Sequence, residues 1–180
     1  MWSGTRRCIA VFLLLVVVGG TSALAARDRG ANDAEILRNV EHAFEVQYPA
    51  SYEASTRHVL DPSYEETFFF RPRSSDRGGI TLRVVELKKY LPKTNTRTEH
   101  SYLNAMRQLR GFRAVKIGDK SGYQFLVCGR ASCDLNLMFI NEHREYTFQA
   151  HVESEDPDRA GFSNFSPEQQ LIVLSLKFLH

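Results

Sequence analysis

The chain has 180 residues, which suits one domain of ordinary size and is too short for two of that size. It carries 23 lysines and arginines against 21 acidic residues, a formal net charge of +2, with 43% hydrophobic and 11% aromatic residues. This composition excludes a disordered charged tail, a collagen-like repeat and a polytopic membrane protein. It also argues against a nucleic-acid binder that depends on bulk positive charge, because such proteins carry a clear cationic excess.

The first 25 residues have the pattern of a signal peptide. Arg6 and Arg7 form a basic start, an apolar run follows over residues 9–18, and a small-residue stretch ends at Ala25. The apolar run is shorter than the ~20 residues that cross a bilayer. We therefore predict cleavage after Ala25 and an extracytoplasmic mature chain, either periplasmic or secreted. The alternative is a membrane anchor formed by an uncleaved N-terminus over residues 9–26.

Removal of this segment changes the composition of the remaining chain. It takes away two arginines and no acidic residue, so 23 basic residues become 21 against 21 acidic ones. The 155 residues that remain are formally neutral, and a domain of this size buries ~70% of the surface of its unfolded chain. The three cysteines fall to two, Cys128 and Cys133, because Cys8 belongs to the signal segment.

Hydrophobic periodicity predicts a chain rich in strands. A flexible leader is expected over residues 26–39, with a short helical turn over 34–38, before a single domain over 40–180. From Val40 to Tyr48 apolar residues alternate until Pro49, which indicates a half-buried strand. Turn-forming residues separate the later strands, which are predicted over 58–60, 66–70, 80–87, 112–117, 122–128, 133–140, 145–152 and 176–179.

Two capping boxes predict two helices. The segments 96–99 and 166–169 each place a hydroxyl three residues before a Glu or Gln, so each can satisfy free N–H groups of a first helical turn. The first helix has an apolar face and ends naturally at Gly111. The second has Pro167 at its first position. Strands in runs with two separated helices predict an α+β fold with an antiparallel sheet.

This order of elements resembles the PsbP/DcrB-like superfamily. The resemblance rests on the segment 44–49, on the hairpins that contain Gly122 and Tyr123, and on the last helix with its Leu-Ser-Leu-Lys-Phe continuation. It extends over residues 40–180, although Ala50 and the next residue stand where members often have Gly-Trp. The resemblance implies an α-β-α sandwich around a central antiparallel sheet and a non-catalytic binding or accessory role. It transfers no metal ligand to this chain.

Cys128 and Cys133 are the sharpest local feature. The four residues between them suit a hairpin turn, which would bring their Cβ atoms within the ~3.5–4.5 Å that a disulfide requires. Export to an oxidising compartment favours a structural disulfide. The alternatives are free thiols or a redox dithiol, although the latter usually has Cys-x-x-Cys spacing. A zinc site would need four ligands, and there is no second cysteine pair.

The last long strand has a polar face that can contact a partner. Glu145, His151 and Glu153 project from one side of it, and alternate apolar residues project from the other. His143 has the same parity, but eight residues of extended strand separate it from His151 by about 26 Å, so the two cannot share an ion. We therefore favour a solvated polar face over a metal site, and we predict no metal and no cofactor.

Three arginines provide a second candidate contact surface. Arg71, Arg73 and Arg77 cluster beside two glycines, where they can contact an anion or an acidic partner. The ordinary alternative is a solvated loop, because Glu65, Glu66 and Asp76 lie nearby.

The sequence contains no catalytic signature. It has no G-x-S-x-G, H-E-x-x-H, P-loop or G-x-G-x-x-G pattern, and turn composition explains His58, Asp61 and Ser63. We predict an exported, non-catalytic accessory module that contacts an envelope or extracellular protein and binds no nucleic acid. The alternative is a small-ligand carrier, or an enzyme whose pocket is assembled from residues distant in sequence. The oligomeric state does not follow from the sequence.

Overall fold

A computed structural model describes residues 33–58, 65–75, 77–87, 98–130, 132–152 and 159–180. Several positions discussed above lie outside these residues. They are the predicted signal peptide, the leader up to residue 32, residues 59–64 with Asp61 and Ser63, Asp76, Thr96 of the first capping box, and Glu153.

The described residues form ten strands, two α-helices and a 3-10 helix. In chain order they are β1 Ala34–Asn39, β2 Phe44–Pro49, β3 Tyr52–His58, β4 Glu65–Pro72, β5 Ile80–Glu86, α2 Thr98–Met106, β6 Arg113–Ile117, β7 Lys120–Cys128, β8 Cys133–Asn141, β9 Arg144–His151, η2 Phe162–Asn164, α3 Pro167–Leu174 and β10 Lys177–Phe178.

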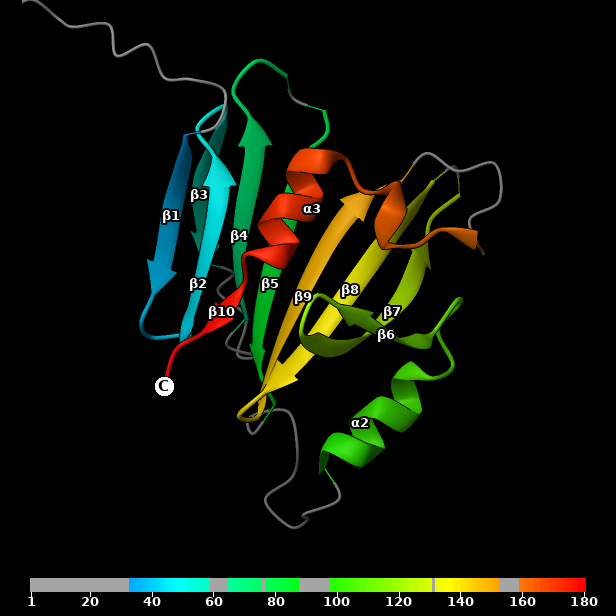
Figure 1. Ribbon diagram of the computed structural model, residues 1–180. Coiled ribbons are helices and arrows are strands. Elements are labelled where there is room, and N and C mark those ends of the chain that lie inside the picture. The colour runs from blue at the N-terminus through cyan, green and yellow to red at the C-terminus, as the bar shows by residue number, and fades with distance from the viewer. Residues whose placement is uncertain (1–32, 59–64, 76, 88–97, 131, 153–158) are drawn as a thin grey trace, which may run out of the picture.

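The strands make two antiparallel sheets. The large sheet has the order β3-β4-β5-β9-β8-β7-β6, and the small sheet has the order β1-β2-β10 (Figure 1). In the large sheet β5 pairs with β9, so that Leu82 lies opposite Phe148. This pairing joins the N-terminal strands to the C-terminal ones across more than 60 residues of chain.

The hydrophobic core lies between the large sheet and a second layer made of the small sheet and α3. We call the face of the large sheet that carries Phe68 and Phe70 the inner face, and the opposite one the outer face. Phe44 packs against Phe68 at 5.0 Å between ring centroids, and Tyr48 packs against Phe70 at 5.4 Å. Such aromatic pairs in edge or tilted geometry stabilise a core beyond their buried area.

Helix α3 begins as its capping box predicts. The Gln169 N–H donates to Ser166 Oγ at 3.2 Å, the Ser166 N–H donates to Gln169 Oε1 at 2.9 Å, and Pro167 occupies the first turn. At the other end, Ser175 Oγ accepts from the Gln47 N–H at 2.8 Å, which fastens the helix to β2. The predicted helix and its start are confirmed.

Helix α2 ends earlier than the sequence predicts. It stops at Met106, and tighter turns follow, with the Leu109 N–H bonded to the Met106 carbonyl at 2.9 Å. Gly111 adopts a positive φ of 65° at the end of these turns instead of terminating the helix itself. The hydroxyl of Tyr102 reaches back from α2 and donates to Glu145 on the outer face of the large sheet.

The helical turn predicted over residues 34–38 is wrong, because this segment is strand β1. Its alternation is hidden in the sequence since Glu35 occupies an inward position. There its carboxylate accepts a hydrogen bond from the Tyr48 hydroxyl at 2.9 Å. Burial raises the pKa of Tyr48, and the hydrogen bond to Glu35 adds to the rise, so the hydroxyl remains a donor at neutral pH.

Two further strand boundaries differ from the prediction. Residues 40–43 form the turn between β1 and β2, in which the His42 N–H donates to Asn39 Oδ1 at 2.8 Å and Ala43 has a φ of 52°. Of the weak strand expected over 58–60, the structure describes only His58, which is the last residue of β3 Tyr52–His58. The exposed polar residues of this strand gave no clear periodicity because β3 is an edge strand of the large sheet.

The α+β class with an antiparallel sheet is confirmed. Sheet dominates the architecture, and a second sheet as well as a helix covers the inner face. The described helices therefore do not form the two layers of a clear α-β-α sandwich.

Gly122 provides a test of this packing. A Cβ at this position would stand 2.5 Å from the Met138 carbonyl oxygen and 2.9 Å from a ring carbon of Phe139. We expect Gly122→Ala to lower the free energy of unfolding by about 2–3 kcal/mol, because neither the backbone nor the buried ring can move freely. Gly129→Ala is the matched control, since its Cβ meets only the Ser132 carbonyl at 3.8 Å. Equal urea midpoints for the two variants would contradict this account.

Candidate functional site

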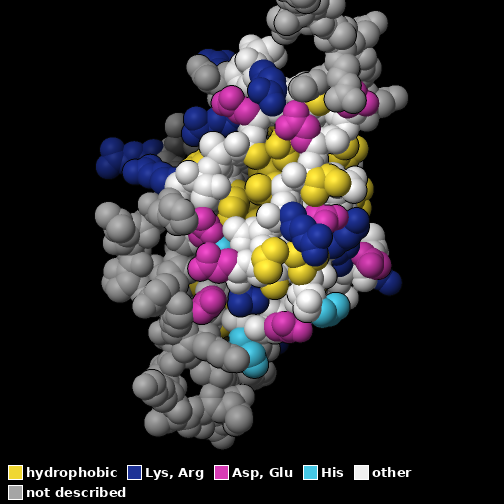
Figure 2. Space-filling view, turned by 90° about the vertical axis from the view of Figure 1, so that its left-hand side faces the viewer, with side chains coloured by type: hydrophobic (Ala, Val, Ile, Leu, Met, Phe, Trp, Pro, Cys, Tyr) yellow, Lys and Arg dark blue, Asp and Glu magenta, His cyan; other side chains and the backbone are white. Residues whose placement is uncertain are grey.

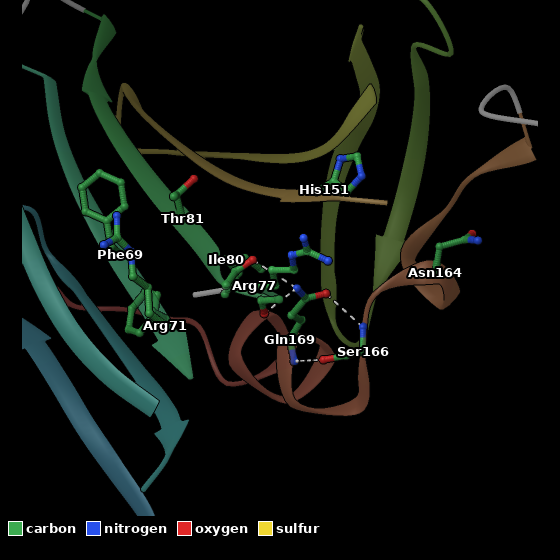
Figure 3. Close-up of a pocket in the computed structure, with 12 residues that line it drawn as sticks. Phe69, Arg71, Arg77, Ile80, Thr81, His151, Asn164, Ser166 and Gln169 are labelled. Carbon is green, nitrogen blue, oxygen red and sulfur yellow. Dashed lines mark hydrogen bonds between the residues drawn. The ribbon is translucent and has the colours of Figure 1, made fainter. Parts of the chain in front are cut away.

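An open pocket lies where the ends of β4, β5 and β9 meet the start of α3. It has a volume of about 850 Å³. We call it the arginine pocket and define it by Phe69, Arg71, Arg77, Thr81, His151 and Gln169. Figure 3 shows Phe69 and Arg71 on one side, His151 on the other, and Arg77 between them.

Strand register explains why these residues meet. Phe70 pairs with Ile80, so one residue further along places Gly79 opposite Arg71. Thr81 pairs with Gln149, so two residues further along places Gly79 opposite His151. Gly79 thus leaves a gap without a side chain between a cation from β4 and an imidazole from β9. This gap opens the pocket at the end of the sheet.

Two of the three predicted arginines line this pocket. The Arg71 guanidinium lies 5.1 Å from the centre of the Phe69 ring, a cation–π contact. Arg77 is exposed, and its backbone N–H donates to Ser75 Oγ at 3.0 Å. Among the described lining residues there is no carboxylate.

The third arginine is directed elsewhere. Arg73 Nε donates to the Ala50 carbonyl at 3.1 Å, and its Nη2 lies 3.5 Å from Glu35 of β1. Arg73 therefore holds the small sheet against the end of β4. Arg73 does not line the pocket, so the three arginines do not form the single contact surface that the sequence predicted.

Gln169 forms the floor of the pocket and was missed by the sequence reasoning, which saw it only as a capping residue. It is 5% exposed, and its Nε2 donates to the carbonyl oxygens of Gly78 at 3.0 Å and Gly79 at 3.1 Å. One side chain thus caps α3 and holds the glycine turn. The only signal available in the sequence was an amide three residues after the N-cap residue Ser166.

Tyr52 supports the same turn as Gln169. Its hydroxyl donates to the Gly78 carbonyl at 3.4 Å. Burial raises the pKa of Tyr52, so the phenol stays protonated and able to donate at neutral pH.

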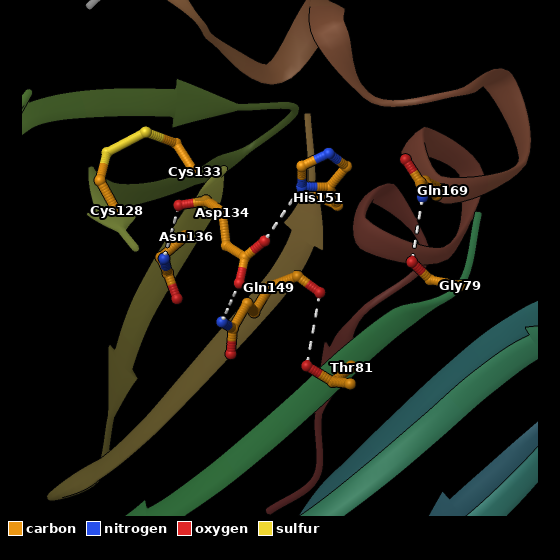
Figure 4. A network of polar contacts seen from close by, with 9 residues as sticks. All are labelled: Gly79, Thr81, Cys128, Cys133, Asp134, Asn136, Gln149, His151 and Gln169. Atoms are coloured by element: carbon orange, nitrogen blue, oxygen red, sulfur yellow. Dashed lines mark hydrogen bonds and ion pairs between the residues drawn. A yellow bond between two sulfur atoms is a disulfide. The ribbon is translucent and has the colours of Figure 1, made fainter. Parts of the chain in front are cut away.

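His151 is held by its neighbours on the outer face. Its Nδ1 lies 3.4 Å from Asp134 Oδ1, and the other oxygen of Asp134 accepts from Gln149 Nε2 at 2.9 Å (Figure 4). The Gln149 carbonyl in turn accepts from the Thr81 hydroxyl at 3.4 Å. The imidazole, 55% exposed, is thus oriented at the rim of the pocket.

The residues of the predicted polar face of β9 lie in different environments in the structure. Glu145 is fully buried, which contradicts a solvated position, because α2 covers it and Arg83 Nη2 donates to its Oε1 at 3.0 Å. Glu145 therefore serves the fold, and only His151 reaches the pocket. His143 lies in the turn before β9 with a φ of 64°, so the parity argument does not apply to it.

Cys128 and Cys133 face each other at the end of the β7–β8 hairpin. Their sulfur atoms are 2.08 Å apart and their Cα atoms 4.0 Å apart, so the pair is capable of the predicted disulfide. Cys133 directly precedes Asp134, the partner of His151, as Figure 4 shows.

Two further regions of the described surface lie outside the arginine pocket. On the side of β1 and β2 hydrophobic, acidic and basic side chains are mixed (Figure 2). Ile36 and Val40 are exposed there at 58% and 77%. A smaller pocket of about 580 Å³ beside α2 is lined by Leu103, Tyr123 and Ile140 among others.

Two general features can be stated for the described part of the chain. No group of three or more His, Cys, Asp or Glu residues there is placed to hold a metal ion. No helix of that part is long and apolar enough to cross a membrane.

The architecture is similar to a solved structure. The cyanobacterial PsbP protein CyanoP from Synechocystis sp. PCC 6803 superposes with a TM-score of 0.51 and 15% identity, covering 81% of this chain and 92% of that one. The fold is PsbP-like. A structure from Bacteroides thetaiotaomicron VPI-5482 gives a TM-score of 0.48 and 9% identity, covering 77% of this chain and 46% of the other. No family model and no curated protein matches the sequence.

The PsbP-like resemblance seen in the sequence is therefore confirmed at the level of the fold. At this identity the likeness does not transfer any residue role, so the arginine pocket has to be interpreted from its own chemistry.

The cysteine pair leads to a direct test. In protein recovered after export we expect a maleimide to label neither cysteine under denaturing conditions, because both sulfurs are in the disulfide. After reduction two labels per chain should appear in the mass spectrum. Full labelling without reductant would show that the thiols are free.

Proposed function

We propose that this protein is an exported, non-catalytic accessory module that binds an acidic segment of another protein at the arginine pocket. The observation that carries the proposal is the pairing pattern of the arginines. Three other arginines have guanidinium groups that meet carboxylates of the fold: Arg73 meets Glu35, Arg83 meets Glu145 and Arg144 meets Glu86. Arg71 and Arg77 line an open pocket without a carboxylate among the described lining residues.

The size of the electrostatic effect favours a protein segment over a free anion. An exposed ion pair contributes about 0.2–1 kcal/mol. Two such contacts stay below the about 4 kcal/mol that corresponds to a millimolar dissociation constant. A ligand therefore needs further contacts around the arginines, and an extended acidic segment can make them along a pocket of about 850 Å³.

The hydroxyl groups of the pocket support binding rather than catalysis. Ser166 Oγ accepts from the Gln169 N–H at 3.2 Å and donates to Glu168 at 2.9 Å, so the helix cap occupies it. The Thr81 hydroxyl is turned toward a backbone carbonyl. Neither is placed as a nucleophile beside a base.

Export is supported by the signal-peptide pattern of residues 1–25 and by a cysteine pair suited to an oxidising compartment. An accessory role fits the PsbP-like fold, because a small domain with an open, charged pocket can act by binding another protein.

Binding can be measured with a fluorescein-labelled polyglutamate peptide and the purified protein. We expect the double variant R71A/R77A to bind about tenfold more weakly, because two cations are lost at one site. Binding should also weaken as salt is raised, since exposed charges are screened over about 10 Å at 0.1 M.

The matched control is R38A/R57A, which removes the same charge from exposed positions on β1 and β3. It should bind the peptide like the wild type. Equal losses in both double variants would mean that the attraction is diffuse, and no binding by the wild type would refute the proposed function.

The export part of the proposal has its own test. Protein recovered from producing cells should begin at Ala26, as read from its intact mass. Recovery of a chain that keeps residues 1–25 in the membrane fraction would support the anchored alternative instead.

A further inference from the structure

Arg71 is set apart from Arg77 by what lies beneath it. Its guanidinium lies over the Phe69 ring at 5.1 Å, which restricts the plane of the fork. An arginine fork held in one plane matches the two oxygens of a carboxylate, whereas a lysine ammonium has no such plane. Phe69 therefore acts as a positioning residue for Arg71.

Gly79 leaves room beside this fork. A Cβ on Gly79 would lie 3.5 Å from Arg71 Cγ and 3.0 Å from the Phe70 carbonyl oxygen. Without it, no side chain of residue 79 occupies the space beside the stem of Arg71, into which Arg77 also reaches between Arg71 and His151 (Figure 3). A ligand group can enter where other residues would place a side chain.

The floor beneath this space does not repel an anion strongly. Carbonyl oxygens carry the negative ends of the backbone dipoles, and those of Gly78 and Gly79 would face an incoming carboxylate unfavourably if they were unpaired. Both are bonded to the Gln169 amide, at 3.0 Å and 3.1 Å. The pairing neutralises them and fixes their direction.

Asp134 limits the charge that the site can accept. Its carboxylate lies 3.4 Å from Nδ1 of His151, a residue that lines the pocket. A doubly charged phosphate would face this carboxylate with more repulsion than a singly charged carboxylate would. The charges around the gap thus favour a monoanion.

The geometry points to a specific carboxylate seat over Gly79, in which the Arg71 fork, held by Phe69, selects a carboxylate group of the partner's acidic segment. The inference rests on the proposed function and adds to it the chemical group that is recognised and the residue that selects it. Arg77 contributes positive charge to the site, whereas Arg71 contributes positive charge together with a guanidinium plane of fixed orientation.

Charge-conserving variants separate shape from charge. Arg71→Lys keeps the positive charge and loses the fork, so polyglutamate should bind about fivefold more weakly with an unchanged salt dependence. Arg57→Lys on β3 is the matched control and should leave affinity unchanged. Phe69→Leu should weaken binding in the same way as Arg71→Lys, because it removes the ring that holds the guanidinium group. Phe69→Tyr keeps an aromatic ring and should bind like the wild type.

Peptide variants identify the source of the carboxylate. One peptide carries internal glutamates and an amidated C-terminus, and the other carries neutral side chains with a free C-terminal carboxylate. Arg71-dependent binding of either peptide supports the carboxylate seat and shows whether a side-chain or a C-terminal carboxylate occupies it. Tighter Arg71-dependent binding of a phosphoserine peptide would overturn the carboxylate assignment.

Failures of the two proposals are distinguishable. If wild type and Arg71→Lys bind polyglutamate equally well and R71A/R77A does not, the seat is wrong and the acidic-segment proposal stands. If the wild type binds none of the peptides, the proposed function itself fails. Matched thermal unfolding of Arg71→Lys and wild type ensures that a lost affinity is not a lost fold.

Discussion

The antiparallel pairing of β5 with β9 is the constraint on which the rest of the molecule depends. Within the large sheet it joins two sets of strands that are each built from local hairpins, with Thr81 opposite Gln149. The same register brings Gly79 opposite His151, so the long-range contact that closes the sheet also creates the arginine pocket. A shift of this pairing by one residue would turn His151 to the inner face and fill the core with polar groups.

Most strands and helix α3 were predictable because their signals are local. The alternation in β9 and the box from Ser166 to Gln169 depend only on neighbours in sequence. Strand β1 was not predictable, because its inward Glu35 is compensated by Tyr48 and Arg73, which a reader of the sequence cannot place beside it. The predicted α-β-α order of layers was also not found, since a second sheet as well as a helix packs on the inner face of the large sheet.

The candidate site was partly visible in the sequence, as two separate surfaces. Arg71 from β4, Arg77 from the loop that follows and His151 from β9 line the same pocket, and their joint role in binding stays a prediction. Arg73 and Glu145 were assigned to these surfaces for their charge, yet each has an intramolecular partner, which pattern alone does not reveal. Gln169 was overlooked because its second set of hydrogen bonds, to the glycine turn, is formed only in the folded chain.

Charge balance explains how a neutral domain can favour an acidic partner. If residues 1–25 are removed, the +2 of the whole chain disappears with Arg6 and Arg7, so no long-range field steers an acidic protein toward this one. Inside the fold, however, Glu35, Glu86 and Glu145 neutralise arginines away from the pocket. Arg71 and Arg77, by contrast, line a pocket whose described lining residues include no carboxylate, and their charge acts within about one Debye length. Such a site discriminates at contact, where the shape and charge of the incoming group count more than the net charge of its carrier.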